Sequence, residues 1–167
     1  MILIGLGANL AHLEYGPPRG TCEAGLEALE RKNINILTRS SWYESAPVPP
    51  SGQSWFVNAV AQVATGMAPA ELLTALHGVE ADFGRVRGVP NAARVLDLDL
   101  LAYDGLVSLP GAWPELPHPR LAVRAFVVFP ILEIAPQWRH PVSGLTAAQL
   151  AEALPPDQVA RPLAGQT

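Results

Sequence analysis

The chain contains very little cysteine, because Cys22 is the only one among its 167 residues. An intrachain disulfide and a zinc site built from cysteines are therefore excluded, and a reducing compartment is the simplest interpretation. Charged residues are also scarce at 16%, whereas 49% of the residues are hydrophobic. This composition is typical of a globular protein and not of a disordered chain.

Long uninterrupted hydrophobic runs are missing as well. Residues 1–7 lack the basic region and the long apolar segment of a secretory signal. The most apolar later stretch, residues 121–135, argues against a membrane span because it is interrupted by Arg124, Pro130 and Glu133. We therefore expect a soluble cytoplasmic protein that does not associate with membranes.

Positive charge is limited, since the net charge is -4. A sequence-independent nucleic-acid binder is disfavoured, because neutralising phosphates requires a basic surface. Five of the 11 basic residues nevertheless fall in one part of the chain, on both sides of an acidic pair: Arg85, Arg87, Arg94, Arg120 and Arg124. This distribution predicts a local anion site in an otherwise acidic protein.

Several sequence motifs of common enzyme classes are absent. There is no Gly-x-x-x-x-Gly-Lys-Ser/Thr loop, and Gly5-x-Gly7 lacks the third glycine of a dinucleotide fingerprint. Nothing resembles a Ser/His/Asp triad or a cysteine nucleophile with its base. The two common nucleotide-binding motifs and covalent acyl chemistry therefore have no support.

The length suits one compact domain, and no repeat or linker divides the chain. Pro155 and Pro156 end the last helical pattern. We therefore expect residues 1–156 to form a single domain and residues 157–167 to form a flexible tail.

The hydrophobic patterns predict a mixture of strands and helices. Strands are expected at residues 1–6, 35–44, 55–64 and 95–103, with a further short strand near 106–109. The strands at 35–44 and 55–64 are expected to pair. Helices are expected at residues 21–31, 69–83 and 146–154, with Thr21 and Thr146 as N-caps, and at 122–134 with an interruption at Pro130. Without regular β-α-β alternation, this pattern favours an antiparallel α+β sandwich.

Asp97 and Asp99 are the strongest candidates for chemistry. Strand geometry places both on one face, with Leu96, Leu98 and Leu100 on the opposite, buried face. Two adjacent carboxylates suit Mg²⁺, although the same alternation is equally typical of the solvated face of an edge strand. The flanking arginines favour the metal site, because Mg²⁺ and guanidinium groups together neutralise a nucleotide triphosphate during transfer.

Other polar and aromatic residues have a functional and an ordinary interpretation. His77 and Glu80 lie on one side of a predicted helix and face either a pocket or solvent. Phe56 and Asn58 share a strand face, which suits a flat heterocycle but is also consistent with core packing. His118 lies between two prolines, either presented to a phosphate or merely exposed.

Seven segments together resemble the 6-hydroxymethyl-7,8-dihydropterin pyrophosphokinase family. They occur in the family's order between residue 3 and about residue 138, at residues 7–10, 41–48, 56–59, 80–87, 94–101, 117–120 and 124–126. The resemblance implies a ferredoxin-like α+β sandwich, with helices packed on a mostly antiparallel sheet. It also implies an ATP-dependent diphosphotransferase of folate biosynthesis, which moves diphosphate from ATP to the hydroxymethyl group of the pterin and releases AMP.

The resemblance further implies a role for individual residues. Asp97 and Asp99 would hold two Mg²⁺ ions, with Arg85, Arg87 and Arg94 as catalytic arginines. The pterin would be bound by Ser45, Pro47, Val48, Phe56, Asn58 and Phe126. ATP, the co-substrate, would be surrounded by His77, Glu80, Arg85, Arg94, Leu98, His118 and Arg124. The expected partners are these small molecules alone, bound by a monomer.

One loop departs from the family pattern. Many members have a tryptophan in an Arg-Trp-Gly-Pro-like run before the equivalent of Arg94, whereas residues 88–93 here are one residue shorter and lack the aromatic. In the family this loop closes over the substrates. The alternatives are therefore a catalytically silent pterin- or nucleotide-binding relative, or a kinase for another heterocyclic alcohol. The retained aspartates, arginines and aromatic residues favour the active enzyme.

Overall fold

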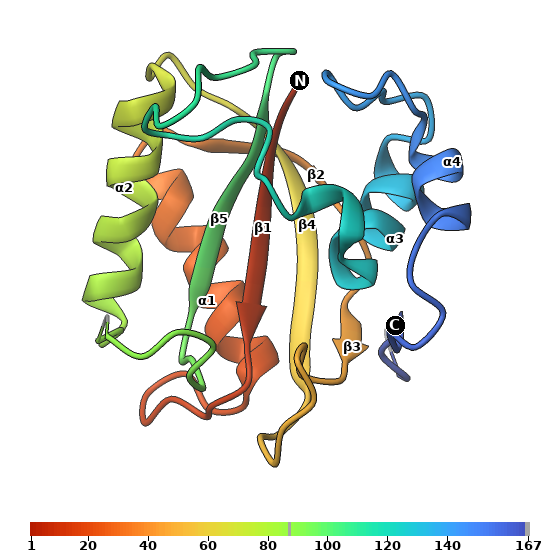
Figure 1. Cartoon of the computed structure of the whole chain (residues 1–167). Coiled ribbons are helices and arrows are strands. Elements are labelled where there is room, and N and C mark those ends of the chain that lie inside the picture. Colours follow the sequence, from red (N-terminus) through yellow and green to blue (C-terminus); the bar gives the residue numbers. More distant parts are fainter. Residues whose placement is uncertain (87, 166–167) are drawn as a thin grey trace.

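The computed structural model describes residues 1–86 and 88–165, in which a six-stranded sheet carries helices on both faces (Figure 1). The strands are β1 (Ile2–Ala8), β2 (Asn35–Arg39), β3 (Tyr43–Ser45), β4 (Phe56–Ala64), β5 (Asp97–Tyr103) and β6 (Ala160–Pro162). Their order is β5-β1-β4-β3-β6, with β2 also paired to β4, and every pairing is antiparallel. The predicted α+β class is confirmed.

The helices divide the apolar residues into two cores. They are α1 (Pro18–Arg31), α2 (Pro69–Asp82), α3 (Ala125–Ile134) and α4 (Ala147–Glu152), with a 3-10 turn, η1 (Leu121–Val123). On β1, Ile4 and Leu6 belong to the core beneath α1 and α2, whereas Leu3 belongs to the core beneath α3 and α4. Because a strand alternates its side chains, β1 is buried on both faces.

Helix α2 forms as its sequence pattern predicts. Pro69 stands at the first helical position, and the apolar positions Leu72, Leu76 and Val79 are buried. Gly84 follows with a φ of +82°, a left-handed conformation that favours glycine and ends the helix. The helix is thereby fixed along β5, which lies at the edge of the sheet.

The predicted start of the first helix is wrong by three residues. Helix α1 begins at Pro18, whose fixed φ suits the first helical turn, and Pro17 occupies the N-cap position. Thr21 is therefore buried inside the helix. Thr146 is confirmed as the N-cap of α4, since its side chain accepts a hydrogen bond of 3.2 Å from the backbone nitrogen of Gln149.

The predicted strand at residues 35–44 is divided into β2 and β3, although both pair with β4 as expected. The division lies at Ser40, whose hydroxyl accepts a hydrogen bond of 3.1 Å from the backbone nitrogen of Val60. A side chain thus takes the place of a carbonyl in the ladder, and the strand is interrupted.

Two predictions for the second half of the chain are also wrong. Residues 106–109 form no strand, because Ser108 makes its hydrogen bonds within its own loop. Its backbone nitrogen donates to the Leu116 carbonyl, and its hydroxyl donates to the Pro114 carbonyl and accepts from the Leu116 backbone nitrogen. Helix α3 continues through Pro130 without an interruption. Proline costs this helix one backbone hydrogen bond, whereas the burial of Pro130 and Ile131 stabilises it.

The prediction of a tail after residue 156 is wrong for Ala160–Pro162. These residues form β6, which pairs with β3 at the edge of the sheet. The division into one domain and a tail otherwise stays a prediction. Among the described residues, no helix is long and apolar enough to cross a membrane.

Candidate functional site

A cavity of about 150 Å³ opens on the sheet beside the start of α3. All six residues predicted to bind the pterin line it: Ser45, Pro47, Val48, Phe56, Asn58 and Phe126. Arg94, Asp97 and Arg124 line it as well. The structure therefore brings the predicted heterocycle-binding residues and part of the charged cluster to one place.

The floor of this cavity is built by neighbouring strands. Asn58 on β4 is buried and donates a hydrogen bond of 2.8 Å from its amide to the Ser45 hydroxyl on β3. Gly7 on β1 faces Asn58, because a Cβ at position 7 would lie 3.1 Å from the Asn58 side-chain oxygen. Glycine at this position leaves room for the amide, whose donors and acceptors can address a polar ring edge.

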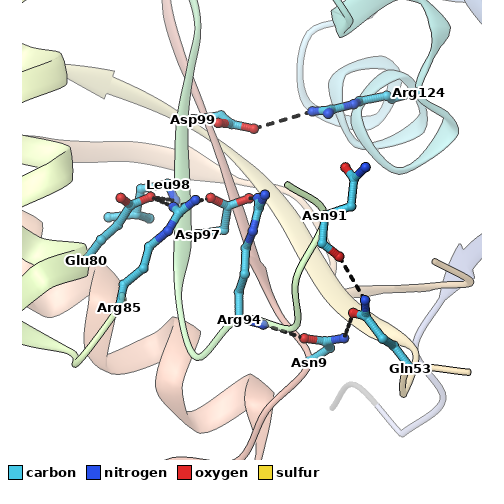
Figure 2. A network of polar contacts seen from close by, with 10 residues as sticks. All are labelled: Asn9, Gln53, Glu80, Arg85, Asn91, Arg94, Asp97, Leu98, Asp99 and Arg124. Atoms are coloured by element: carbon cyan, nitrogen blue, oxygen red, sulfur yellow. Dashed lines mark hydrogen bonds and ion pairs between the residues drawn. The ribbon is translucent and has the colours of Figure 1, made fainter. Parts of the chain in front are cut away.

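Asp97 and Asp99 lie on the same face of β5, as predicted, and each contacts guanidinium groups (Figure 2). Asp97 pairs with both Arg85 and Arg94, one on each carboxylate oxygen. Asp99 lies 3.5 Å from the Arg124 guanidinium. Three predicted site arginines thus surround the acidic pair from the loop before β5 and from the start of α3.

The surroundings of Asp99 disfavour the charged form of its carboxylate. Burial raises the pKa of Asp99, and the nearby Asp97 carboxylate raises it further, against the opposing effect of His118 and Arg124. A cation at this position would relieve both effects. Burial also lowers the pKa of Arg124, whose charge the Asp99 carboxylate helps to retain.

His118 is held beside this carboxylate by its backbone. The backbone nitrogen of His118 donates a hydrogen bond of 2.8 Å to the Leu101 carbonyl of β5. The ring Nδ1 of His118 accepts a hydrogen bond of 3.1 Å from the backbone nitrogen of Arg120. Burial lowers the pKa of His118, although Asp99 opposes this effect. With Nδ1 as an acceptor, the neutral ring carries its proton on Nε2, which can donate to an anion.

Glu80 ties helix α2 to the edge of β5. Its side chain is 1% exposed, and its carboxylate accepts a hydrogen bond of 2.7 Å from the Leu98 backbone nitrogen and pairs with Arg85. The Leu98 side chain lies in the core beneath α1 and α2. Leu98, predicted to bind ATP, can therefore reach a ligand only through its backbone. The predicted roles of Glu80 and His77 in binding ATP stay predictions.

Asn9 and Gln53 were not singled out from the sequence, yet they connect two loops around the cavity (Figure 2). The Asn9 amide donates to the Gln53 side chain at 3.1 Å, and its oxygen accepts from the Arg94 backbone at 2.8 Å. Gln53 in turn donates to the Asn91 carbonyl at 2.8 Å. The loop that contains Asn91 is thereby joined to the loop before β4. The one available signal was a polar Asn9 directly after a buried strand.

Trp113 lies near His77, one of the residues predicted to bind ATP. Its ring centroid lies 6.3 Å from that of His77, and its side chain is 57% exposed. An exposed tryptophan in a proline-rich loop carries no periodic signal. Arg87, the remaining predicted catalytic arginine, lies outside the described residues.

The donor set of Asp97 and Asp99 fits Mg²⁺ held jointly with a nucleotide. Among the described residues, no three His, Cys, Asp or Glu side chains are grouped to hold a metal ion by themselves. Mg²⁺ usually takes one or two protein carboxylates and completes its shell with water and substrate phosphates. Two carboxylates on one face of a rigid strand meet this requirement.

Comparisons with known proteins agree with this geometry. The chain matches the family model of 7,8-dihydro-6-hydroxymethylpterin-pyrophosphokinase over residues 3–136. It is 37% identical to the 2-amino-4-hydroxy-6-hydroxymethyldihydropteridine pyrophosphokinase of Pseudomonas aeruginosa over 162 residues, which cover 96% of this chain and 95% of that protein. It is 35% identical to a folic acid synthesis protein of Pneumocystis carinii, covering 90% of this chain and 20% of that one.

A solved structure supports the fold. The chain superposes on Plasmodium falciparum HPPK-DHPS with a TM-score of 0.66, covering 91% of this chain and 43% of that one. At 12% sequence identity, this likeness concerns the fold alone. It agrees with the predicted ferredoxin-like sandwich.

Proposed function

The chain belongs to the 7,8-dihydro-6-hydroxymethylpterin-pyrophosphokinase family, and on this premise we propose that it transfers diphosphate from ATP to 6-hydroxymethyl-7,8-dihydropterin in folate biosynthesis. The observation that carries the proposal is the cavity in which Phe56, Asn58 and Phe126 lie next to Asp97. A flat heterocycle in this cavity would present its substituent to the charged cluster.

The pterin would be bound by stacking and by hydrogen bonds. Phe56 and Phe126 line the same cavity from β4 and α3, and aromatic rings at such positions bind flat heterocycles through stacking. The Asn58 amide and the backbone of residues 45–48 would pair with the polar edge of the ring. This combination favours a fused, amide-like ring over a purely apolar ligand.

ATP would be bound by the charged cluster. We propose that Asp97 and Asp99 hold two Mg²⁺ ions, which when bound supply positive charge that neutralises the triphosphate. The guanidinium groups of Arg85 and Arg94, now paired with Asp97, would turn to phosphate oxygens. His118 and Arg124, which lie near Asp99, would donate to the same phosphates.

The course of the reaction is what membership of the family implies. The pterin hydroxyl oxygen attacks the β-phosphorus, the bond from that phosphorus to the oxygen bridging the α-phosphate breaks, and AMP leaves with the electron pair. The hydroxyl proton is released to solvent. The protein contributes positioning and charge neutralisation and forms no covalent intermediate.

Incubation with ATP, Mg²⁺ and the pterin tests the proposal. We expect AMP only when the pterin is present. Asp97→Ala should lower AMP formation at least about 100-fold, since it removes a carboxylate at the reacting phosphates while leaving the buried leucines of β5 in place. Asp82→Ala changes an exposed aspartate at the end of α2 and is the matched control. Pterin binding by the folded wild-type protein without AMP formation would refute the proposal.

We further propose that the enzyme acts as a cytoplasmic monomer. Its single cysteine is buried and free, which suits a reducing compartment. For a monomer, size-exclusion chromatography should give a mass near 17.8 kDa. Elution at twice that mass would contradict a monomer.

A further inference from the structure

The segment after α4 lies against both walls of the cavity, although the family match ends at residue 136. In Figure 1 the chain runs from α4 to the edge of the sheet beside β3. The Val159 carbonyl accepts a hydrogen bond of 3.2 Å from Ala46, next to the cavity residues Ser45 and Pro47. The residue before Val159, Gln158, contacts the opposite wall.

The Gln158 amide binds the backbone on both sides of Arg124. Its Nε2 donates to the Val123 carbonyl at 2.6 Å, and its Oε1 accepts from the Ala125 backbone nitrogen at 2.8 Å. The donor and the acceptor of the Gln158 amide are thereby both bonded to the backbone of residues 123–125. The backbone that carries Arg124 is held between them.

This contact takes the place of a local helix cap. Arg124 is the N-cap residue of α3, has an extended backbone, and makes no capping hydrogen bond with its side chain. The first amides of a helix have no partner within the helix. For Ala125, Gln158 supplies that partner from 33 residues away.

The position of Arg124 matters at the site. Its guanidinium lies 3.5 Å from Asp99 and 5.4 Å from the centre of the Phe126 ring. The Arg124 carbonyl accepts the first backbone hydrogen bonds of α3, from Val127 and Val128. A shift of this backbone would therefore move the arginine and the aromatic wall together.

We propose that Gln158 is a positioning residue, which sets the places of Arg124 and Phe126 through the backbone of residues 123–125. The inference rests on the proposed function in that these two side chains are taken to contact the substrates. Gln158 itself does not line the cavity.

Kinetics of Gln158→Ala test the inference, with Gln137→Ala, which changes an exposed glutamine, as the matched control. We expect Gln158→Ala to lower kcat/KM roughly 10-fold, since small misplacements of site groups have large effects on rate. In an Arg124→Ala background the same change should have a much smaller effect, because it acts through Arg124. Equal fold losses in both backgrounds, or an unchanged kcat/KM, would overturn the inference.

Hydrogen exchange of the Ala125 amide tests the contact independently of turnover. In Gln158→Ala this amide should exchange roughly fivefold faster, the equivalent of one hydrogen bond. Gln158→Glu keeps the acceptor oxygen and should retain the protection. Unchanged exchange in Gln158→Ala would overturn the inference even in an active enzyme. Conversely, a wild-type protein that forms no AMP would refute the proposed function, while the exchange experiment would still decide the contact.

Discussion

Asp97 has both of its carboxylate oxygens paired with arginines, and Asp99 faces a third arginine. Like charges so close together repel, and the guanidinium groups offset that repulsion. A bound triphosphate would supply negative charge for the arginines, and its cations would supply positive charge for the aspartates. The site can therefore exchange ion pairs within the protein for ion pairs with the substrate, without leaving a carboxylate or guanidinium uncompensated.

Glu80→Ala should destabilise the fold by about 3–5 kcal/mol, the usual cost of removing one partner of a buried ion pair. The substitution leaves the Leu98 amide at the edge of β5 and the Arg85 guanidinium without this carboxylate. Urea unfolding measures the loss. Glu80→Gln keeps an acceptor for Leu98 and should cost less, and the exposed Glu152→Ala should change little. Equal stabilities of Glu80→Ala and the wild type would contradict this role.

At the scale of single elements, the loops of residues 46–55 and 88–94 are joined by side chains that belong to neither strands nor helices. Asn9 contacts Arg94 and Gln53, and Gln53 contacts Asn91 (Figure 2). Asn91 and Gln53 also line the cavity. The loop that contains Asn91 thus has an anchor beside the cavity that does not require a tryptophan.

Gln53→Ala should raise the KM for the pterin roughly fivefold, since it removes the hydrogen bond that holds the loop of residue 91 beside the cavity. The KM for ATP should change less, because Asn9 still accepts the hydrogen bond from the Arg94 backbone when the Gln53 side chain is removed. Steady-state kinetics with each substrate varied in turn measures both. Gln137→Ala is again the control. An unchanged KM for the pterin would show that the anchor does not affect binding.

Local patterns predicted α2 and β5 because their apolar spacing is regular and their ends carry proline, glycine or charged residues. The division at Ser40, the strand β6 and the contact of Gln158 depend on partners distant in the sequence, such as Val60 and Ala125. Likewise, the family motifs selected six residues for pterin binding that all line the one cavity. They did not identify Gln53, whose partner Asn9 is 44 positions away.

At the scale of the whole molecule, the sheet has two unlike faces. The face beneath α1 and α2 is a continuous apolar core, whereas the face beneath α3 and α4 gives way to the cavity beyond Gly7. The first core stabilises the fold, while the second face leaves room for the cavity. Changes in the first core are therefore expected to affect stability more than binding.

Cys22 lies in this first core and gives a pH dependence of stability. Burial raises the pKa of its thiol from 9.0 to about 12, and Glu23 adds to the effect. Between these values the unfolded chain has lost the proton that the folded protein retains, so stability falls as pH rises, by up to about 1.4 kcal/mol per pH unit. Below pH 9 this contribution is fully present.

Comparison with Cys22→Ala isolates the thiol from the other groups that titrate. The difference in unfolding free energy between the wild type and the variant should become less favourable to the wild type between about pH 8 and about pH 11. Urea unfolding at both pH values measures it. A difference independent of pH would mean that the folded thiol ionises as readily as the unfolded one.

In the proposed reaction the β- and γ-phosphates move together from ATP to the pterin. Mass spectrometry and phosphorus NMR of the products of a single incubation measure this most directly. The proposed pyrophosphokinase activity predicts AMP and a pterin diphosphate in equal amounts. ADP with a pterin monophosphate, or no transfer by a folded protein supplied with ATP, Mg²⁺ and the pterin, would contradict it.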